Sequence, residues 1–176
     1  FPVDSAFRYS REKDFEEWKD RLHIYGLDLR HTPSVELFCT YVEQKYPRLD
    51  ILINNAAQTV RRPPGFYAHM MANELLSYDD LPKSVQSLMK PFEECKQHLR
   101  LAEGKRTSSQ AVAAVGWSEK TTGMGLSSSA RLSQIPYVHD DQLVVQEVFP
   151  KGKLDVDLQQ VDLREMNSWR LKLGDI

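Results

Sequence analysis

The sequence predicts an α/β fold built on a parallel sheet, and three observations lead to this prediction. Residues 1–57 alternate between helix-like and strand-like segments. The clearest amphipathic helix in the chain lies between two short apolar runs. The second run contains residues 51–53, which are consecutively apolar, as is typical of a strand buried on both faces. Such alternation favours parallel strands joined by right-handed crossovers.

Two segments of this region carry helical signals. Residues 4–21 are charged and helix-favouring. Phe15, Trp18 and Leu22 recur at i, i+3 and i+7, which places them on one face of a helix. In the next helix, Thr32 is expected as the N-cap and Pro33 as the first helical residue. The apolar face of that helix is then predicted to contain Val35, Phe38, Cys39 and Val42.

The first apolar run, residues 23–30, ends on Asp28 and Leu29. Open parallel sheets bind ligands at the carboxyl ends of their strands. A carboxylate in that place can accept a hydrogen bond from an adenine amino group, and an apolar neighbour can lie against the adenine ring. The alternative interpretation is that Asp28 only caps a helix or a turn.

The second run ends on Asn54 and Asn55, which are followed by Ala56 and Ala57. Carboxamides donate and accept hydrogen bonds at once, so they can hold neighbouring strands or a ligand. Small alanines let a dinucleotide approach the backbone. The alternative is that the asparagine pair only turns the chain after the strand.

The order GLDLR, helix, LDILINNAA resembles the short-chain dehydrogenase/reductase family. The resemblance implies a Rossmann-like, doubly wound parallel sheet, of which this chain holds a part. It also implies hydride transfer between NAD or NADP and a carbonyl or alcohol substrate. Asp28 and Leu29 would then be adenine-pocket residues, and Asn54 to Ala57 the fourth-strand motif. Ala57 stands where the family has glycine.

The family's other motifs do not occur where they are expected. A glycine-rich phosphate loop would precede Phe1, so the chain is interpreted as an excerpt of a longer polypeptide. Tyr41 and Lys45 form a YxxxK pattern, but it precedes the NNAA motif and is predicted to be a surface pair on a helix. No residue of the chain is therefore assigned a catalytic role. Gly123-Met124-Gly125 imitates a dinucleotide loop, and we predict a flexible loop there.

Residues 1–57 are accordingly predicted to be part of a Rossmann-type domain, and residues 58–176 an insertion on the substrate side of the same domain. The insertion is predicted to be mainly helical and loop, with Pro82 and Pro91 interrupting its helices. Turn chemistry is visible at Pro150-Lys151-Gly152.

Composition restricts the partners and the compartment. The net charge of −2 gives no reason to propose a nucleic acid, and no apolar run has the length of a membrane helix. Two cysteines suit a reducing compartment and hence the cytoplasm, and the five histidines show no metal-binding spacing. The substrate and the choice between NAD and NADP stay open. The alternative function is a non-catalytic Rossmann-like scaffold or interaction subunit, with an oligomer or partner chain completing the sheet.

Overall fold

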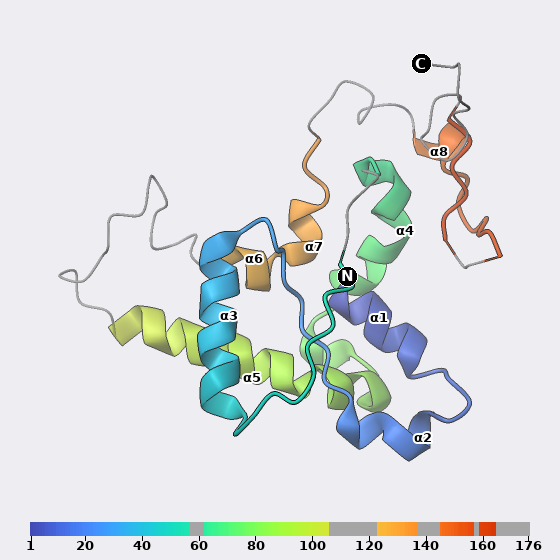
Figure 1. Ribbon diagram of the computed structural model, residues 1–176. Coiled ribbons are helices and arrows are strands. Elements are labelled where there is room, and N and C mark those ends of the chain that lie inside the picture. The colour runs from blue at the N-terminus through green and yellow to red at the C-terminus, as the bar shows by residue number, and fades with distance from the viewer. Residues whose placement is uncertain (57–61, 106–122, 137–144, 157–158, 165–176) are drawn as a thin grey trace. The chain divides into compact units, whose positions relative to one another are not determined.

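The computed structural model describes residues 1–56, 62–105, 123–136, 145–156 and 159–164 (Figure 1). These residues belong to two compact units. The first unit contains Phe1–Leu52 and Asn73–Leu132, and the second contains Ile53–Ala72 and Ser133–Ile176. Within the described residues, both units are built from helices and irregular segments.

The predicted Rossmann-like parallel sheet is wrong for the described part of the chain. Regular strands are absent there, and the only β pairing is an isolated antiparallel bridge between Leu154 and Gln160. Residues 23–30 and 49–55, both expected as strands, are irregular. A strand needs a neighbouring strand to satisfy its backbone N–H and C=O groups, and no described segment pairs with either run. The helical character predicted for the later part of the chain is seen.

The helices of the first unit follow one another in short pieces around one long helix. In chain order they are α1 (Pro2–Tyr9), α2 (Phe15–Trp18), η1 (Lys19–Arg21), α3 (Thr32–Lys45), η2 (Tyr78–Asp80), α5 (Lys83–Lys105), α6 (Met124–Ser127) and α7 (Ser129–Leu132). Helix α4 (Pro64–Glu74) runs from the second unit into the first, and α8 (Val145–Val148) lies in the second.

Helix α5 supplies the core of the first unit, and it packs against both α1 and α3 (Figure 1). Its buried stripe follows helical spacing and consists of Val85, Leu88, Met89, Phe92, Cys95 and Leu99. The prediction that Pro91 interrupts this helix was wrong, because α5 continues through it. Proline removes one intrahelical hydrogen bond, and burial of the flanking apolar side chains offsets that loss.

The predicted helix over residues 4–21 is divided into α1, α2 and η1. The five residues between α1 and α2 have the sequence SREKD and contribute no apolar side chain to the core. A short helix in water is marginal unless one face is buried, so the helix ends where that face is missing. Phe15 restarts it, because its side chain is buried in the core.

Helix α3 was predicted almost correctly, with its N-cap displaced by one residue. The N-cap is His31, whose Nδ1 accepts a hydrogen bond from the Ser34 amide at 3.3 Å. The buried positions of α3 are Ser34 and Tyr41, whereas Cys39 is exposed. Phe38 and Val42 of the predicted apolar face do pack against the core from partly buried positions, so that prediction was confirmed for these two residues and wrong for Cys39.

The irregular segment before α3 passes through the core at Gly26. A Cβ atom there would lie 2.7 Å from Pro2 Cγ and 2.8 Å from Ser129 Oγ. These distances are shorter than side chains tolerate, so glycine is required where α1, α7 and the segment meet. The same segment is tied to α5 by a hydrogen bond of 3.2 Å from the Ile24 amide to the Leu88 carbonyl.

In the second unit, the predicted turn at Pro150-Lys151-Gly152 is confirmed. The Lys153 amide donates to the Pro150 carbonyl at 3.2 Å, and Gly152 has a φ of 78°. A positive φ at the third residue of a β-turn is a conformation for which glycine is preferred. The side chain of Gln160 also stabilises the turn, because its amide donates to the Pro150 carbonyl at 3.0 Å.

Candidate functional site

Asp28 lies in the loop before α3, and Arg30 holds its carboxylate. The Arg30 Nε and Nη2 atoms donate to Oδ1 at 3.0 Å and to Oδ2 at 2.7 Å, and the Arg30 amide donates to Oδ1 at 2.9 Å. These hydrogen bonds hold the pKa of Asp28 below its usual value, although partial burial opposes them. The residue is an ionised turn carboxylate, and Oδ2 still has acceptor capacity.

The loop that carries Asp28 is fastened to α6. The Asp28 amide donates to the Gly125 carbonyl at 2.9 Å, and the Gly125 amide donates to Ser34 Oγ at 3.0 Å. Ser34 Oγ also lies 2.7 Å from His31 Nδ1. The prediction of a flexible loop at Gly123-Met124-Gly125 was therefore wrong: residues 124–127 are helical, and Gly125 and Leu126 are buried.

The remaining predicted cofactor residues that the structure describes are exposed. Leu29 is 59% exposed, and Asn54, Asn55 and Ala56 are exposed in an irregular segment. Ala57 lies outside the described residues. Asp28 and Leu29 fall in the first unit, and the asparagine pair falls in the second.

Four large apolar side chains precede the asparagine pair and face solvent. They are Leu49, Ile51, Leu52 and Ile53, with exposed fractions of 68%, 75%, 71% and 80%. A strand buried on both faces was expected here, and that prediction was wrong. Such a run is an exposed apolar segment of the kind that marks a contact with another chain or another segment.

The Tyr41–Lys45 pattern is part of the packing between α3 and α5. The Tyr41 hydroxyl donates to the Pro91 carbonyl at 3.5 Å, and Lys45 Nζ lies 3.0 Å from Glu94 Oε2. Tyr41 is buried, so its predicted surface position was wrong. Burial raises its pKa despite the lowering effect of Lys45, whereas an acid/base tyrosine needs a lowered pKa.

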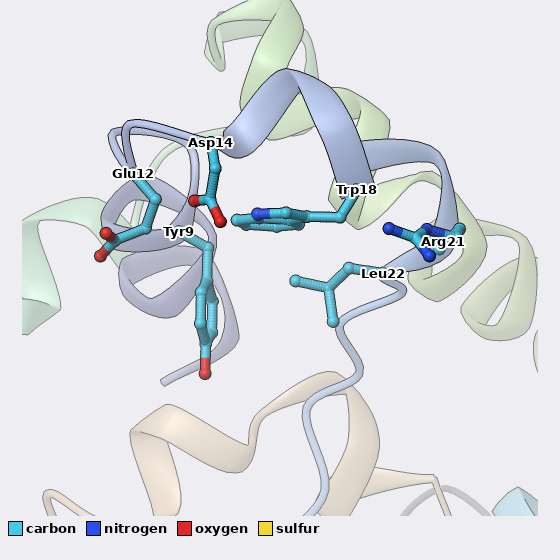
Figure 2. Close-up of a pocket in the computed structure, with 6 residues that line it drawn as sticks. All are labelled: Tyr9, Glu12, Asp14, Trp18, Arg21 and Leu22. Atoms are coloured by element: carbon cyan, nitrogen blue, oxygen red, sulfur yellow. The ribbon is translucent and has the colours of Figure 1, made fainter.

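One open pocket forms at the turn between α1 and α2, and sequence reasoning missed it (Figure 2). It has a volume of about 440 Å³, and it is lined by Tyr9, Glu12, Asp14, Trp18, Arg21 and Leu22. The Tyr9 and Trp18 rings meet edge to face, with centroids 6.2 Å apart and planes at 89°. The sequence signal was Trp18 itself, which was assigned to a helix face rather than to a cavity wall.

The second unit contains a charged cluster of Asp162, Arg62 and Arg164, and no sequence pattern indicated it. The carboxylate of Asp162 accepts hydrogen bonds from Arg62 at 2.8 Å and from Arg164 at 2.8 Å. Burial disfavours the charged form of Asp162, but the two arginines outweigh that effect and hold its pKa below the usual value. The guanidinium of Arg62 lies over the Phe66 ring, 4.8 Å from its centroid, and that of Arg164 over Phe149.

Among the described residues, no three side chains of histidine, cysteine, aspartate or glutamate converge as metal ligands would. None of the helices in that part of the chain combines the length and apolarity needed to cross a membrane. No family model matches the chain, and neither characterised proteins nor solved structures give a significant match.

Proposed function

We propose that the chain takes part in NAD(P)-dependent oxidoreduction of the short-chain type, on a carbonyl or alcohol substrate in the cytoplasm. The observation that carries the proposal is the order of motifs in the sequence. Asp28 and Leu29 precede a 14-residue helix, α3, and LDILINNA follows it. This order resembles the adenine-side half of such an enzyme. The proposal concerns only how the chain would recognise the cofactor, and it does not include the parallel sheet.

The geometry fits one part of this role. Asp28 keeps acceptor capacity on Oδ2, although its side chain is only 10% exposed, and the exposed Leu29 beside it offers apolar surface for an adenine ring. The chain is therefore proposed to bind the adenine end, and no chemical step is assigned to its residues. NAD or NADP would supply the hydride chemistry.

A second function is favoured by a different observation. The exposed side chains of Leu49, Ile51, Leu52 and Ile53 suit a non-catalytic interaction subunit, in which this segment adds to the sheet edge of a partner or of a longer polypeptide. Pairing with a sheet edge would satisfy the segment's backbone groups and bury its apolar side chains.

Titration with NADH and NADPH, followed by nicotinamide fluorescence, tests the first function. Asp28→Ala is expected to weaken binding by roughly 1–2 kcal/mol, the size of one hydrogen bond to a charged group. Asp20→Ala, which removes an exposed carboxylate from η1, is the matched control. Equal affinities of Asp28→Ala and the unaltered protein would remove Asp28 from the cofactor site.

The native polypeptide should be measured first, by intact mass and by peptide sequencing across both ends of this chain. A mass well above 20.3 kDa, with a glycine-rich loop before Phe1 and a YxxxK pattern after Ile176, would support the oxidoreductase. A mass equal to that of this chain would favour the interaction subunit, and a search for its partner would follow.

A further inference from the structure

We propose that the pocket between α1 and α2 binds an organic cation, an ammonium group carried on an apolar body. This pocket lies apart from the residues assigned to the dinucleotide, and the proposal does not depend on the proposed function. Its six lining residues come from the end of α1, the following turn, α2 and η1, all within the first unit.

The aromatic wall of the pocket is held in place by packing. Trp18 is half-buried, and its ring meets the buried Phe15 ring at 5.3 Å and 89°. Tyr9 meets the same indole from the other side of the pocket, also edge to face (Figure 2). Tyr9 is 48% exposed, and its ring forms a right-angled corner with the packed indole of Trp18. The face of a tryptophan ring is the best aromatic partner for a cation.

The charge of the pocket selects the sign of the ligand. Glu12 and Asp14 line it on the side of the turn, and neither makes an ion pair with any described residue. Figure 2 shows the Asp14 carboxylate directed toward the indole. Two carboxylates with no cationic partner favour a cation and disfavour a phosphate or carboxylate ligand.

Arg21 is the one cation in the lining, and it is occupied elsewhere. Its Nη2 atom donates to the Glu17 carbonyl at 3.3 Å, which holds the guanidinium against α2. Figure 2 places Arg21 at the opposite end from Glu12 and Asp14. The pocket therefore has one acidic end and one basic end, with Trp18 and Leu22 between them.

The size and apolarity of the pocket select the class of cation. A volume of about 440 Å³ is in the range that holds small organic ligands. Leu22 and the two aromatic rings offer apolar surface, whereas a bare metal ion requires a shell of oxygen ligands. Methylated or alkyl ammonium groups combine a positive charge with apolar surface, because the charge can lie near the carboxylates while the carbon atoms contact the rings.

Choline is the first probe, with its neutral isostere 3,3-dimethylbutan-1-ol as the matched ligand control, both followed by calorimetry and ligand NMR. Choline is expected to bind at least tenfold more tightly than the neutral isostere. Trp18→Leu and Asp14→Asn are each expected to weaken choline binding roughly tenfold. Glu16→Gln should leave it unchanged, because that carboxylate is paired with Lys19 and does not line the pocket.

Folding of the variants is checked by circular dichroism, and Trp18→Phe gives a second test that keeps an aromatic face. It is expected to retain more affinity for choline than Trp18→Leu. Equal binding of choline and its neutral isostere, or equal binding of choline by Asp14→Asn and the unaltered protein, would overturn the proposal. NADH affinity should be the same in Trp18→Leu, so failure here is distinguishable from failure of the dinucleotide assignment.

A short peptide containing trimethyllysine distinguishes the two sources of such a cation. Tighter binding of the peptide than of choline would assign the pocket to a side chain of a protein partner. Tighter binding of choline would assign it to a free small molecule. If neither choline nor the peptide binds more tightly than the neutral isostere, the cation site is refuted.

Discussion

The amide of Gly125 donates a hydrogen bond to the hydroxyl of Ser34 at 3.0 Å, across 91 positions of the sequence. This bond joins α6 to the first turn of α3, next to the loop that carries Asp28. The approach is close because Gly125 has no side chain. A Cβ atom there would lie 2.8 Å from His31 Cβ and 2.9 Å from Ser34 Cβ.

Gly125→Ala is therefore expected to destabilise the protein by about 1–3 kcal/mol, because α3 and α6 must move apart. The measurement is the free energy of unfolding in urea. Ser127→Ala, on the exposed face of the same short helix, is the control and should change it by less than about 0.5 kcal/mol. Equal stability of the two variants would show that α6 does not pack on α3.

Because the apolar run at residues 49–53 is exposed, truncation of Ile51 and truncation of the core residue Leu88 should differ in their effect on the free energy of unfolding. Ile51 is 75% exposed, so Ile51→Ala should change the free energy of unfolding by less than about 0.5 kcal/mol. Leu88 is completely buried in α5, and Leu88→Ala should cost roughly 2–5 kcal/mol. A large loss in Ile51→Ala would restore the buried strand that the sequence predicted.

The two cysteines should differ in reactivity. Cys39 is exposed on α3, whereas Cys95 is completely buried, and burial raises the pKa of its thiol to about 11. Only the thiolate reacts, so a disulfide reagent at neutral pH should modify one thiol in the native protein and two in urea. Cys39→Ser should abolish the native reaction, and a rapid native reaction in that variant would contradict the burial of Cys95.

The Asp162 cluster predicts an acid-sensitive contribution to stability. The folded pKa of Asp162 is below the unfolded value, so its contribution is fully present above the unfolded pKa. That contribution is lost as the pH falls through the folded pKa. Asp162→Asn should cost roughly 1.5–3 kcal/mol at neutral pH. The difference from the unaltered protein should shrink progressively below about pH 4.

Unfolding curves of Asp162→Asn and the unaltered protein, recorded from neutral pH downward, measure this dependence. Glu147→Gln, an exposed change in the same unit, is the control. A difference that stays constant down to strong acid would mean that the Asp162 charge is not what the arginines stabilise.

Tyr41→Phe tests the rejection of the YxxxK pattern. The variant loses only a long hydrogen bond to the Pro91 carbonyl, so its free energy of unfolding should fall by about 1 kcal/mol or less. Dinucleotide affinity, and activity wherever the native polypeptide is active, should be unchanged. Loss of activity in this variant, with binding intact, would make Tyr41 a catalytic residue after all.

The sequence by itself determined the helix α3 nearly to the residue, since its apolar spacing and the proline in its first turn are local signals. The turn at Pro150-Lys151-Gly152 was determined in the same way. The helical character of the region around α5 was also visible, although Pro91 concealed its continuity. These features depend on neighbours within about one helical turn or one β-turn.

Tertiary structure decided everything that depends on distant partners. An apolar run becomes a buried strand only where other strands receive its backbone, and Ile51 to Ile53 have none among the described residues. Gly125 looked like part of a loop because its partner, Ser34, lies 91 positions away. Asp162 meets Arg62 across 100 positions, because folding brings together residues that no sequence spacing relates.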